Sequence, residues 1–127
     1  MKIITHEEIN SKLCGIPITV EPDFSRIELK TDDSMMVDKQ GLVHGGFIFG
    51  LADYAAMLAV NDPNVVLGGA DVKFLKPVKV GETIIAEAQI TSTKGTKHTV
   101  SVTVSRNDEA IFSGDFTCFV LDKHVLL

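Results

Sequence analysis

The stretch that organises the predicted fold covers residues 42–53 and reads LVHGGFIFGLAD. From Gly45 to Val60 nearly every residue is apolar, and an Asn-Asp-Pro-Asn turn follows at residues 61–64. This pattern predicts one long helix that begins at the glycines and ends near Val60. Because a helix without a polar face must be enclosed by the rest of the fold, we expect the other elements to surround it.

The remainder of the chain alternates apolar and polar residues with the period of two that is typical of β-strands. In the clearest case, residues 96–105 place valines on one face and Ser and Thr on the other. The pattern predicts strands at residues 16–20, 24–30, 65–75, 83–91, 96–105 and 110–120, a loop at residues 31–40, and a short helix between Thr5 and Cys14. The sequence therefore predicts an α+β fold in which an antiparallel sheet wraps around one long buried helix. We expect residues 1–127 to form a single domain.

Composition and charge exclude several classes of protein. The 12 Lys and Arg against 17 Asp and Glu give a net charge of −5, which argues against a nucleic-acid partner held by bulk electrostatics. The longest mostly apolar stretch, residues 47–60, is shorter than the roughly 20 residues of a membrane span. No signal peptide is evident at the N-terminus, so we expect a cytoplasmic protein without a membrane partner. Cys14 and Cys118 stand alone, so we expect no disulfide framework and no metal site.

Two glycines at the start of the long helix point to a possible chemistry. The first turn of a helix leaves backbone N–H groups without partners, and these groups can stabilise a carbonyl oxygen that gains negative charge. Gly45 and Gly46 would keep side chains away from such an oxygen. The alternative is that the glycines only allow close packing or the turn into the helix. His44 could bond the same carbonyl or hold the loop, and we slightly favour the loop role.

Asp53 is the one acidic residue inside the apolar helix. A buried carboxylate is costly unless it is paired or used, and burial raises its pKa and suits it to act as a general base. The alternative is a carboxylate that caps a backbone group or pairs with a lysine. His44 and Asp53 are nine residues apart, which places them roughly 180° around and roughly 13 Å along the helix. If both are catalytic, we expect a composite site shared by two chains of a two-fold dimer.

The pattern resembles the hotdog-fold thioesterases, and in particular the PaaI-like group. The resemblance rests on His44-Gly45-Gly46, on an acidic residue nine positions after the His, and on the segment FLKPVKVGE at residues 74–82. It covers about residues 16–120. It implies hydrolysis of an acyl-CoA thioester by a homodimer or homotetramer, with no cofactor other than the coenzyme A of the substrate.

The same resemblance implies roles for individual residues. The Gly45 N–H would polarise the thioester carbonyl, His44 would assist it, and Asp53 of a partner chain would activate water or attack directly. Substrate contacts are implied for Asp38, Gly46, Gly68, Gly69 and Lys76, with lysines at residues 76–79 near the CoA phosphates. The chain departs from the pattern at Asp38, where many members have Asn, and at residues 67–69, where some carry a hydroxyl. A carboxylate donates a hydrogen bond only when it is protonated.

Other functions remain open on this sequence. The later half of the chain also resembles the ligand-sensing domain of the malonyl-CoA-responsive repressor of fatty-acid synthesis, so a domain that binds acyl-CoA or acyl carrier protein without turnover is the main alternative. The stretch before the first predicted strand looks too short for a helix-turn-helix. A hydratase or dehydratase acting on an enoyl thioester, and a purely structural dimer, are less favoured.

Overall fold

The computed structural model describes all residues from Met1 to Leu127. Its centre is helix α2, Gly45–Val60, which begins at the predicted glycines and ends where Asn61 adopts a left-handed conformation, with φ at 51°. Most side chains of α2 are buried, including Leu51, Leu58 and the alanines between them. The prediction of one long enclosed helix is thus confirmed.

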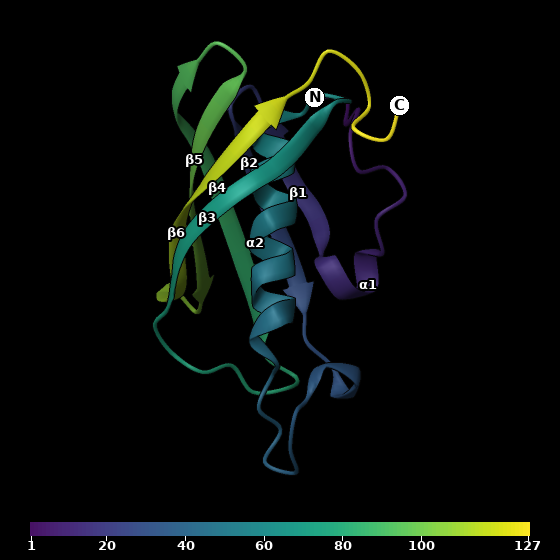
Figure 1. Cartoon of the computed structure of the whole chain (residues 1–127). Coiled ribbons are helices and arrows are strands. Elements are labelled where there is room, and N and C mark those ends of the chain that lie inside the picture. Colours follow the sequence, from purple (N-terminus) through teal and green to yellow (C-terminus); the bar gives the residue numbers. More distant parts are fainter.

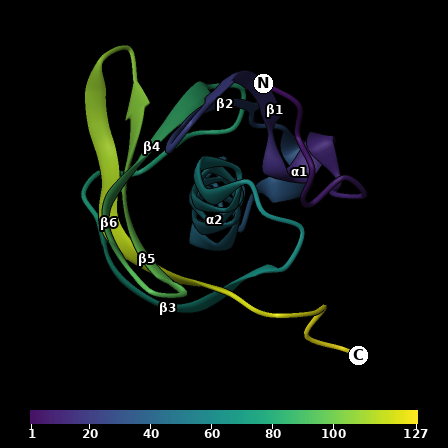
Figure 2. The same cartoon turned by 90° about the horizontal axis from the view of Figure 1, so that it is seen from above.

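The sheet around α2 has six strands in the order β1-β2-β4-β5-β6-β3, and every neighbouring pair is antiparallel. Seen along the helix axis, the sheet curves around one side of α2 (Figure 2). The strands are β1 Ile16–Glu21, β2 Phe24–Lys30, β3 Val65–Phe74, β4 Thr83–Lys94, β5 Lys97–Arg106 and β6 Glu109–Val120. The α+β fold with an antiparallel sheet wrapped around one helix is therefore confirmed, and the strand predictions were accurate to within three residues. Neither α-helix has the combination of length and apolar character that crossing a bilayer requires.

The first helix was predicted wrongly. Helix α1 spans only Ser11–Cys14, and its cap is Asn10, whose side chain accepts hydrogen bonds from the N–H groups of Lys12 and Leu13. Residues 5–10 do not join it because His6 has a φ of 52°, which an α-helix does not allow. His6 is itself half-buried and lies against Tyr54.

The predicted loop at residues 31–40 contains a short helical turn. This 3-10 turn, η1, spans Asp33–Met35, and Met35 is buried. After it, residues 36–43 form a narrow hairpin-like loop, because Met36 bridges Val43 and the Val37 N–H donates to the Leu42 carbonyl. This loop extends below the start of α2 (Figure 1). The loop connects η1 to Gly45 and Gly46 at the start of α2.

The two edge strands of the sheet differ. Strand β1 contains Pro17 and an irregular register beside it, two features that discourage pairing with another chain. Strand β3 pairs only with β6, and its outer edge carries no proline. Gly68 and Gly69 lie at a register shift within β3. The longer edge of the sheet is therefore open to a further strand.

Candidate functional site

The imidazole of His44 caps helix α2. Its Nδ1 atom accepts a hydrogen bond from the Gly46 N–H at 2.7 Å, and the His44 N–H donates to the Met35 carbonyl at 2.9 Å. His44 thus has the loop-holding role that the sequence favoured. Because Nδ1 accepts, the proton of the neutral ring sits on Nε2, and the exposed side chain can present that second N–H to a ligand. Gly46, in contrast, has its N–H occupied.

Gly45 offers the free donor at this helix end. It is the first residue of α2, and its N–H has no hydrogen-bond partner in the chain. The ring of Phe74 lies over it, since a Cβ atom built on Gly45 would come within 3.2 Å of Phe74 Cε1. An unpaired N–H at the positive end of a helix of 16 residues is suited to bind an oxygen that gains negative charge.

Asp53 carries the second unusual feature. Its Oδ1 atom is the only buried side-chain nitrogen or oxygen in the structure without a hydrogen-bond partner. It forms no ion pair, so the alternative of a lysine-paired carboxylate is excluded. Burial raises the pKa of Asp53 to about 6, as the sequence predicted. A carboxylate with that pKa can hold and release a proton near neutral pH.

Both cysteines lie close to Asp53. Burial raises the pKa of the Cys118 thiol to about 12, and the nearby Asp53 carboxylate adds to that rise. Burial also raises the pKa of Cys14, again with a contribution from Asp53. Cys118 faces the core from β6 and is fully buried, whereas Cys14 is half-buried at the end of α1. A raised pKa keeps both of these thiols near Asp53 neutral.

The donor and the carboxylate lie at different levels of the same helix. Gly45 and Asp53 are separated by eight residues, or about 12 Å along the axis. Strand β3 runs past both levels: its last residue, Phe74, covers Gly45, and Leu67 near its start pairs with Cys118 beside Asp53. None of the five main cavities of the chain is lined by His44, Gly45 or Asp53. One chain thus presents two separate half-sites.

Gly68 and Gly69 lie at the level of Asp53. They follow Leu67 at the irregular point of β3, opposite Thr117 and Cys118. A Cβ on Gly68 would collide with the ring of Phe119, whereas Gly69 faces open space. The structure does not bring either glycine to Gly45 of the same chain, and their predicted contact with substrate stays a prediction.

The side chain of Asp38 bonds to the backbone of the loop that contains it. Its Oδ1 atom accepts hydrogen bonds from the N–H groups of Gln40 and Leu42, at 3.0 and 3.2 Å. Because an acceptor role occupies the carboxylate, the position shapes the loop that leads to His44. The structure shows no contact between Asp38 and His44 or Gly45, so its predicted role at the substrate stays a prediction.

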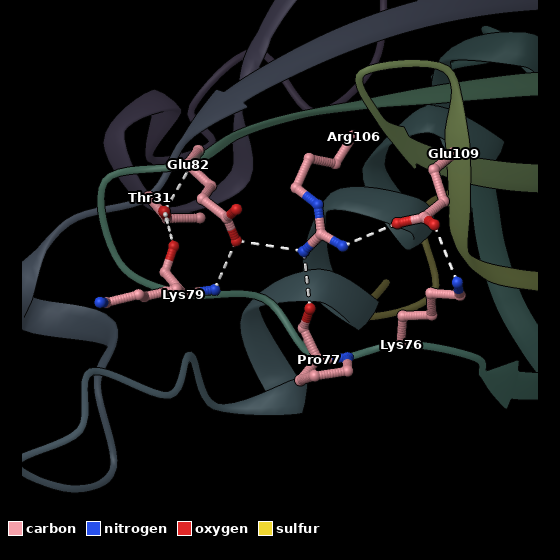
Figure 3. A network of polar contacts seen from close by, with 7 residues as sticks. All are labelled: Thr31, Lys76, Pro77, Lys79, Glu82, Arg106 and Glu109. Carbon is pink, nitrogen blue, oxygen red and sulfur yellow. Dashed lines mark hydrogen bonds and ion pairs between the residues drawn. The ribbon is translucent and has the colours of Figure 1, made fainter.

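The lysines of the crossover between β3 and β4 belong to a polar network that the sequence did not predict (Figure 3). Lys76 Nζ pairs with Glu109 at 2.8 Å, and Arg106 donates to Glu109, to Glu82 and to the Pro77 carbonyl. The Lys79 ammonium extends away from this network and forms no ion pair. Of the two, Lys79 is thus the cation left free. No three His, Cys, Asp or Glu side chains gather into a cluster that could hold a metal.

Comparisons with known proteins agree with this architecture. A family model described as the thioesterase superfamily matches residues 40–112. An uncharacterized protein of Pyrococcus horikoshii has a crystal structure with a TM-score of 0.99 and 52% identity, covering 100% of this chain and 98% of that one. The PaaI protein of Escherichia coli, from the phenylacetic acid degradation operon, shares the fold at 20% identity, with a TM-score of 0.80 over 88% of this chain and 83% of that one.

Two curated relatives are longer than this chain. A methylthioribose-1-phosphate isomerase of Aquifex aeolicus is 53% identical over 96% of this chain, but the match spans only 27% of that protein. The transcription factor FapR of a Thermoanaerobacter species is 31% identical over 76% of this chain and 48% of its own length. The chain thus spans half or less of these relatives. The family model covers more than half of the chain and includes the whole segment from His44 to Asp53, so this chain belongs to the thioesterase superfamily.

Proposed function

We propose that this chain hydrolyses an acyl-CoA thioester to a free acid and CoA, at a site built by two copies of the chain. The observation that carries the proposal is Asp53, whose buried Oδ1 atom lacks any partner while every other buried side-chain polar atom has one. Keeping such a carboxylate costs about 1–3 kcal/mol or more. A catalytic base or nucleophile for thioester hydrolysis explains why the chain retains it.

The chemistry follows from the two half-sites. The thioester carbonyl oxygen would bind the Gly45 N–H, with His44 Nε2–H as a second donor, so that negative charge on this oxygen is stabilised. Asp53 would take a proton from water as the water oxygen attacks the carbonyl carbon, or would attack that carbon itself. In the first route the carbon–sulfur bond then breaks, the sulfur takes the proton that Asp53 accepted, and CoA leaves as the thiol. In the second route CoA leaves as a thiolate that takes a proton from solvent, and water then hydrolyses the acyl anhydride on Asp53, which releases the acid and restores the carboxylate. Neither route requires a cofactor or metal.

The two half-sites would meet through strand β3. Antiparallel pairing of β3 with its counterpart around a two-fold axis places the start of one strand beside the end of the other. The Asp53 level of one chain, with Gly68 and Gly69, would then lie opposite the Gly45 level of its partner. The open outer edge of β3 and the proline on β1 favour this arrangement. We therefore propose at least a homodimer, with a tetramer as its possible extension.

The remaining predicted contacts fit the same substrate. We propose that Lys79, whose ammonium is free, binds a CoA phosphate. Lys76 would bind a phosphate only after its ion pair with Glu109 breaks. Gly46 and Asp38 would act indirectly, by holding the His44 ring and the loop before it. The cytoplasmic location expected from the sequence agrees with a CoA-ester substrate and belongs to this proposal.

The test is the release of free thiol from short, medium, long and aromatic acyl-CoAs. We expect Asp53→Ala to lose at least about 100-fold in kcat, the scale of general base catalysis. Gly45→Pro removes the donor N–H, and proline is well tolerated at the first helical position. His44 before it has φ −60° and ψ 131°, which a following proline allows. We expect a loss of about 100-fold or more for this variant.

Gly45→Ala is the matched control for the proline variant. It adds the same Cβ against Phe74 but keeps the N–H, so we expect its activity to stay within about tenfold of the parent. Equal activities of the two variants would remove the Gly45 donor from the mechanism. Parent-like activity of Asp53→Ala would remove Asp53.

The second candidate function is an acyl-CoA sensor without turnover. It is favoured by the match to FapR, which is described as a transcription factor. Under this alternative the parent protein binds acyl-CoA with a measurable affinity but releases no thiol from any member of the panel. The same experiment therefore separates the two functions.

A further inference from the structure

The ring of Phe74 lies beside Gly45, the residue that carries the free N–H. Three atoms of its ring would lie 3.2, 3.6 and 3.7 Å from a Cβ on Gly45. The ring is nevertheless 54% exposed, because Phe74 is the last residue of the edge strand β3. A large apolar surface thus lies beside the residue that carries the donor and is left uncovered by the chain.

The packing beneath Phe74 fixes the position of its ring. It meets Phe112 edge to face, with ring centres 5.0 Å apart and planes at 77°, which is a favourable aromatic geometry. Phe112 and Phe116 are fully buried, and Phe116 in turn contacts Phe49 at 5.4 Å. Phe49 lies one helical turn after Gly45. A row of rings therefore supports Phe74 from the core to the donor.

The position of Phe74 determines which part of a thioester it would touch. A carbonyl oxygen bonded to the Gly45 N–H sits about 2.9 Å from that nitrogen. Because the Phe74 ring lies on the Cβ side of the same residue, a group attached to the carbonyl carbon on that side would meet the ring. One side of the carbonyl is the acyl group and the other leads to the pantetheine arm with its two amides. A ring without hydrogen-bonding groups suits an apolar acyl group and offers nothing to an amide.

We propose that Phe74 is a specificity-determining residue whose ring forms the wall beside the first carbons of the acyl group and limits their width. This inference rests on the proposed function. The ring already stands at contact distance from Gly45, so an acyl chain that is branched at the carbon next to the carbonyl must displace it. A straight acyl chain lies beside the Phe74 ring without displacing it. The site therefore selects unbranched over branched acyl groups.

The test compares butanoyl-CoA with 2-methylpropanoyl-CoA, whose acyl groups contain the same atoms and differ only in branching. The measured quantity is the ratio of kcat/KM for the branched to the straight substrate. We expect Phe74→Ala to raise this ratio by at least about tenfold, the usual effect of one misplaced methyl group in an apolar pocket. Phe74→Leu, which keeps most of the bulk, serves as a second variant if the alanine variant does not fold, and should raise the ratio less.

Leu75→Ala is the matched control. Leu75 is the next residue, is 48% exposed and is not among the side-chain atoms nearest to Gly45, so its loss removes similar apolar surface without opening the wall. We expect the ratio to stay within twofold of the parent. An unchanged ratio in Phe74→Ala, or an equal change in both variants, overturns the proposal. A change of oligomeric state with an unchanged ratio also overturns it, because the ring would then belong to a subunit contact.

A binding experiment separates this inference from the proposed function. Ketone analogues of the two substrates, with a methylene group between sulfur and carbonyl, keep the oxygen but cannot be hydrolysed. If the parent hydrolyses neither thioester, the proposed function fails. The ratio of the two analogue dissociation constants still tests Phe74, and we expect the same tenfold shift in Phe74→Ala. An unchanged ratio of dissociation constants overturns the role of Phe74 by itself.

Discussion

At the scale of single residues, Asp53 is a partly buried carboxylate whose buried Oδ1 atom has no hydrogen-bond partner. Other polar side chains in the interior are satisfied, as shown by Ser25, whose hydroxyl donates to the Ala55 carbonyl at 2.6 Å. Asp53 lies two residues before Ala55 on the same helix, and its Oδ1 atom forms no hydrogen bond. Its neighbours include two thiols, Cys14 and Cys118, whose pKa values are raised. The Asp53 carboxylate therefore lowers the free energy of unfolding.

This cost has a defined pH dependence. The pKa of Asp53 is about 6 in the folded chain and about 3.9 in the unfolded chain. Between pH 4 and pH 6 the unfolded state loses its proton first, so the free energy of unfolding falls as the pH rises. The loss is complete above pH 6 and amounts to about 2–3 kcal/mol. We expect Asp53→Asn to be more stable than the parent at pH 8 by about this amount and to show no gain at pH 4.

Thermal unfolding followed by circular dichroism at both pH values measures the difference. Other titrating groups are common to the two proteins and cancel in the comparison. A gain in Tm of the same size at pH 4 and pH 8 would contradict the desolvation of Asp53.

At the scale of elements, the crossover between β3 and β4 supports the loop that leads into α2. The Val43 N–H donates to the Val78 carbonyl, and the Val80 N–H donates to the Gly41 carbonyl. Arg106 holds the same crossover from β5, through the Pro77 carbonyl at 2.7 Å and Glu82 at 3.1 Å. A series of short contacts thus connects a residue on the sheet to the backbone just before His44.

We expect Arg106→Met to loosen the start of α2. The substitution leaves Glu82 and Glu109 without their common partner and frees the Pro77 carbonyl, so we expect a loss of about 1–3 kcal/mol in stability. Because the donor geometry at Gly45 would be less well held, we expect kcat to fall about tenfold with little change in KM. Urea unfolding and initial rates measure the two effects.

Arg26→Met is the matched control for this substitution. Arg26 forms an exposed ion pair with Glu87 on β4, away from the crossover, and such pairs contribute about 0–1 kcal/mol. We expect a small loss of stability and an unchanged kcat. Equal effects of the two variants on kcat would show that Arg106 does not position the donor.

The elements also show how far the sequence could predict the structure. Helix α2 and the six strands follow from apolar periodicity, and Asp53 and Gly45 follow from the identity and spacing of a few residues. The start of α1 was missed because the polar run before it contains several possible caps, of which Asn10 forms the bonds. The contacts of Arg106 with Glu82 and Pro77 could not be predicted, because these partners are 24 and 29 residues away and only the fold brings them together. The contact of Phe74 with Gly45 has the same origin.

At the scale of the whole molecule, the proposed function joins two copies of the chain along the open edge of β3. In a two-fold dimer each site would take Gly45 from one chain and Asp53 from the other. A chain altered at only one of these residues then still supplies an intact half-site to its partner. A chain altered at Gly45 and a chain altered at Asp53 can therefore form one intact site together.

Co-expression of Asp53→Ala and Gly45→Pro chains tests this arrangement. Random pairing makes about half of the dimers mixed, and each mixed dimer holds one intact site and one doubly altered site. We expect the mixture to recover about a quarter of the parental activity, whereas either variant alone remains inactive. No recovery in purified mixed dimers, isolated with two different affinity tags, would falsify the shared site.

The burial of Cys118 also affects the optical assay of the reaction. Colorimetric thiol reagents react with thiolates, and a fully buried thiol with a pKa of about 12 contributes essentially no thiolate at the alkaline pH used for such reagents. Cys14 is half-buried and has a raised pKa as well. The colour that develops therefore reports CoA from the first seconds. A slow later rise in colour that disappears in a Cys118→Ala variant would instead measure how often β6 separates from α2.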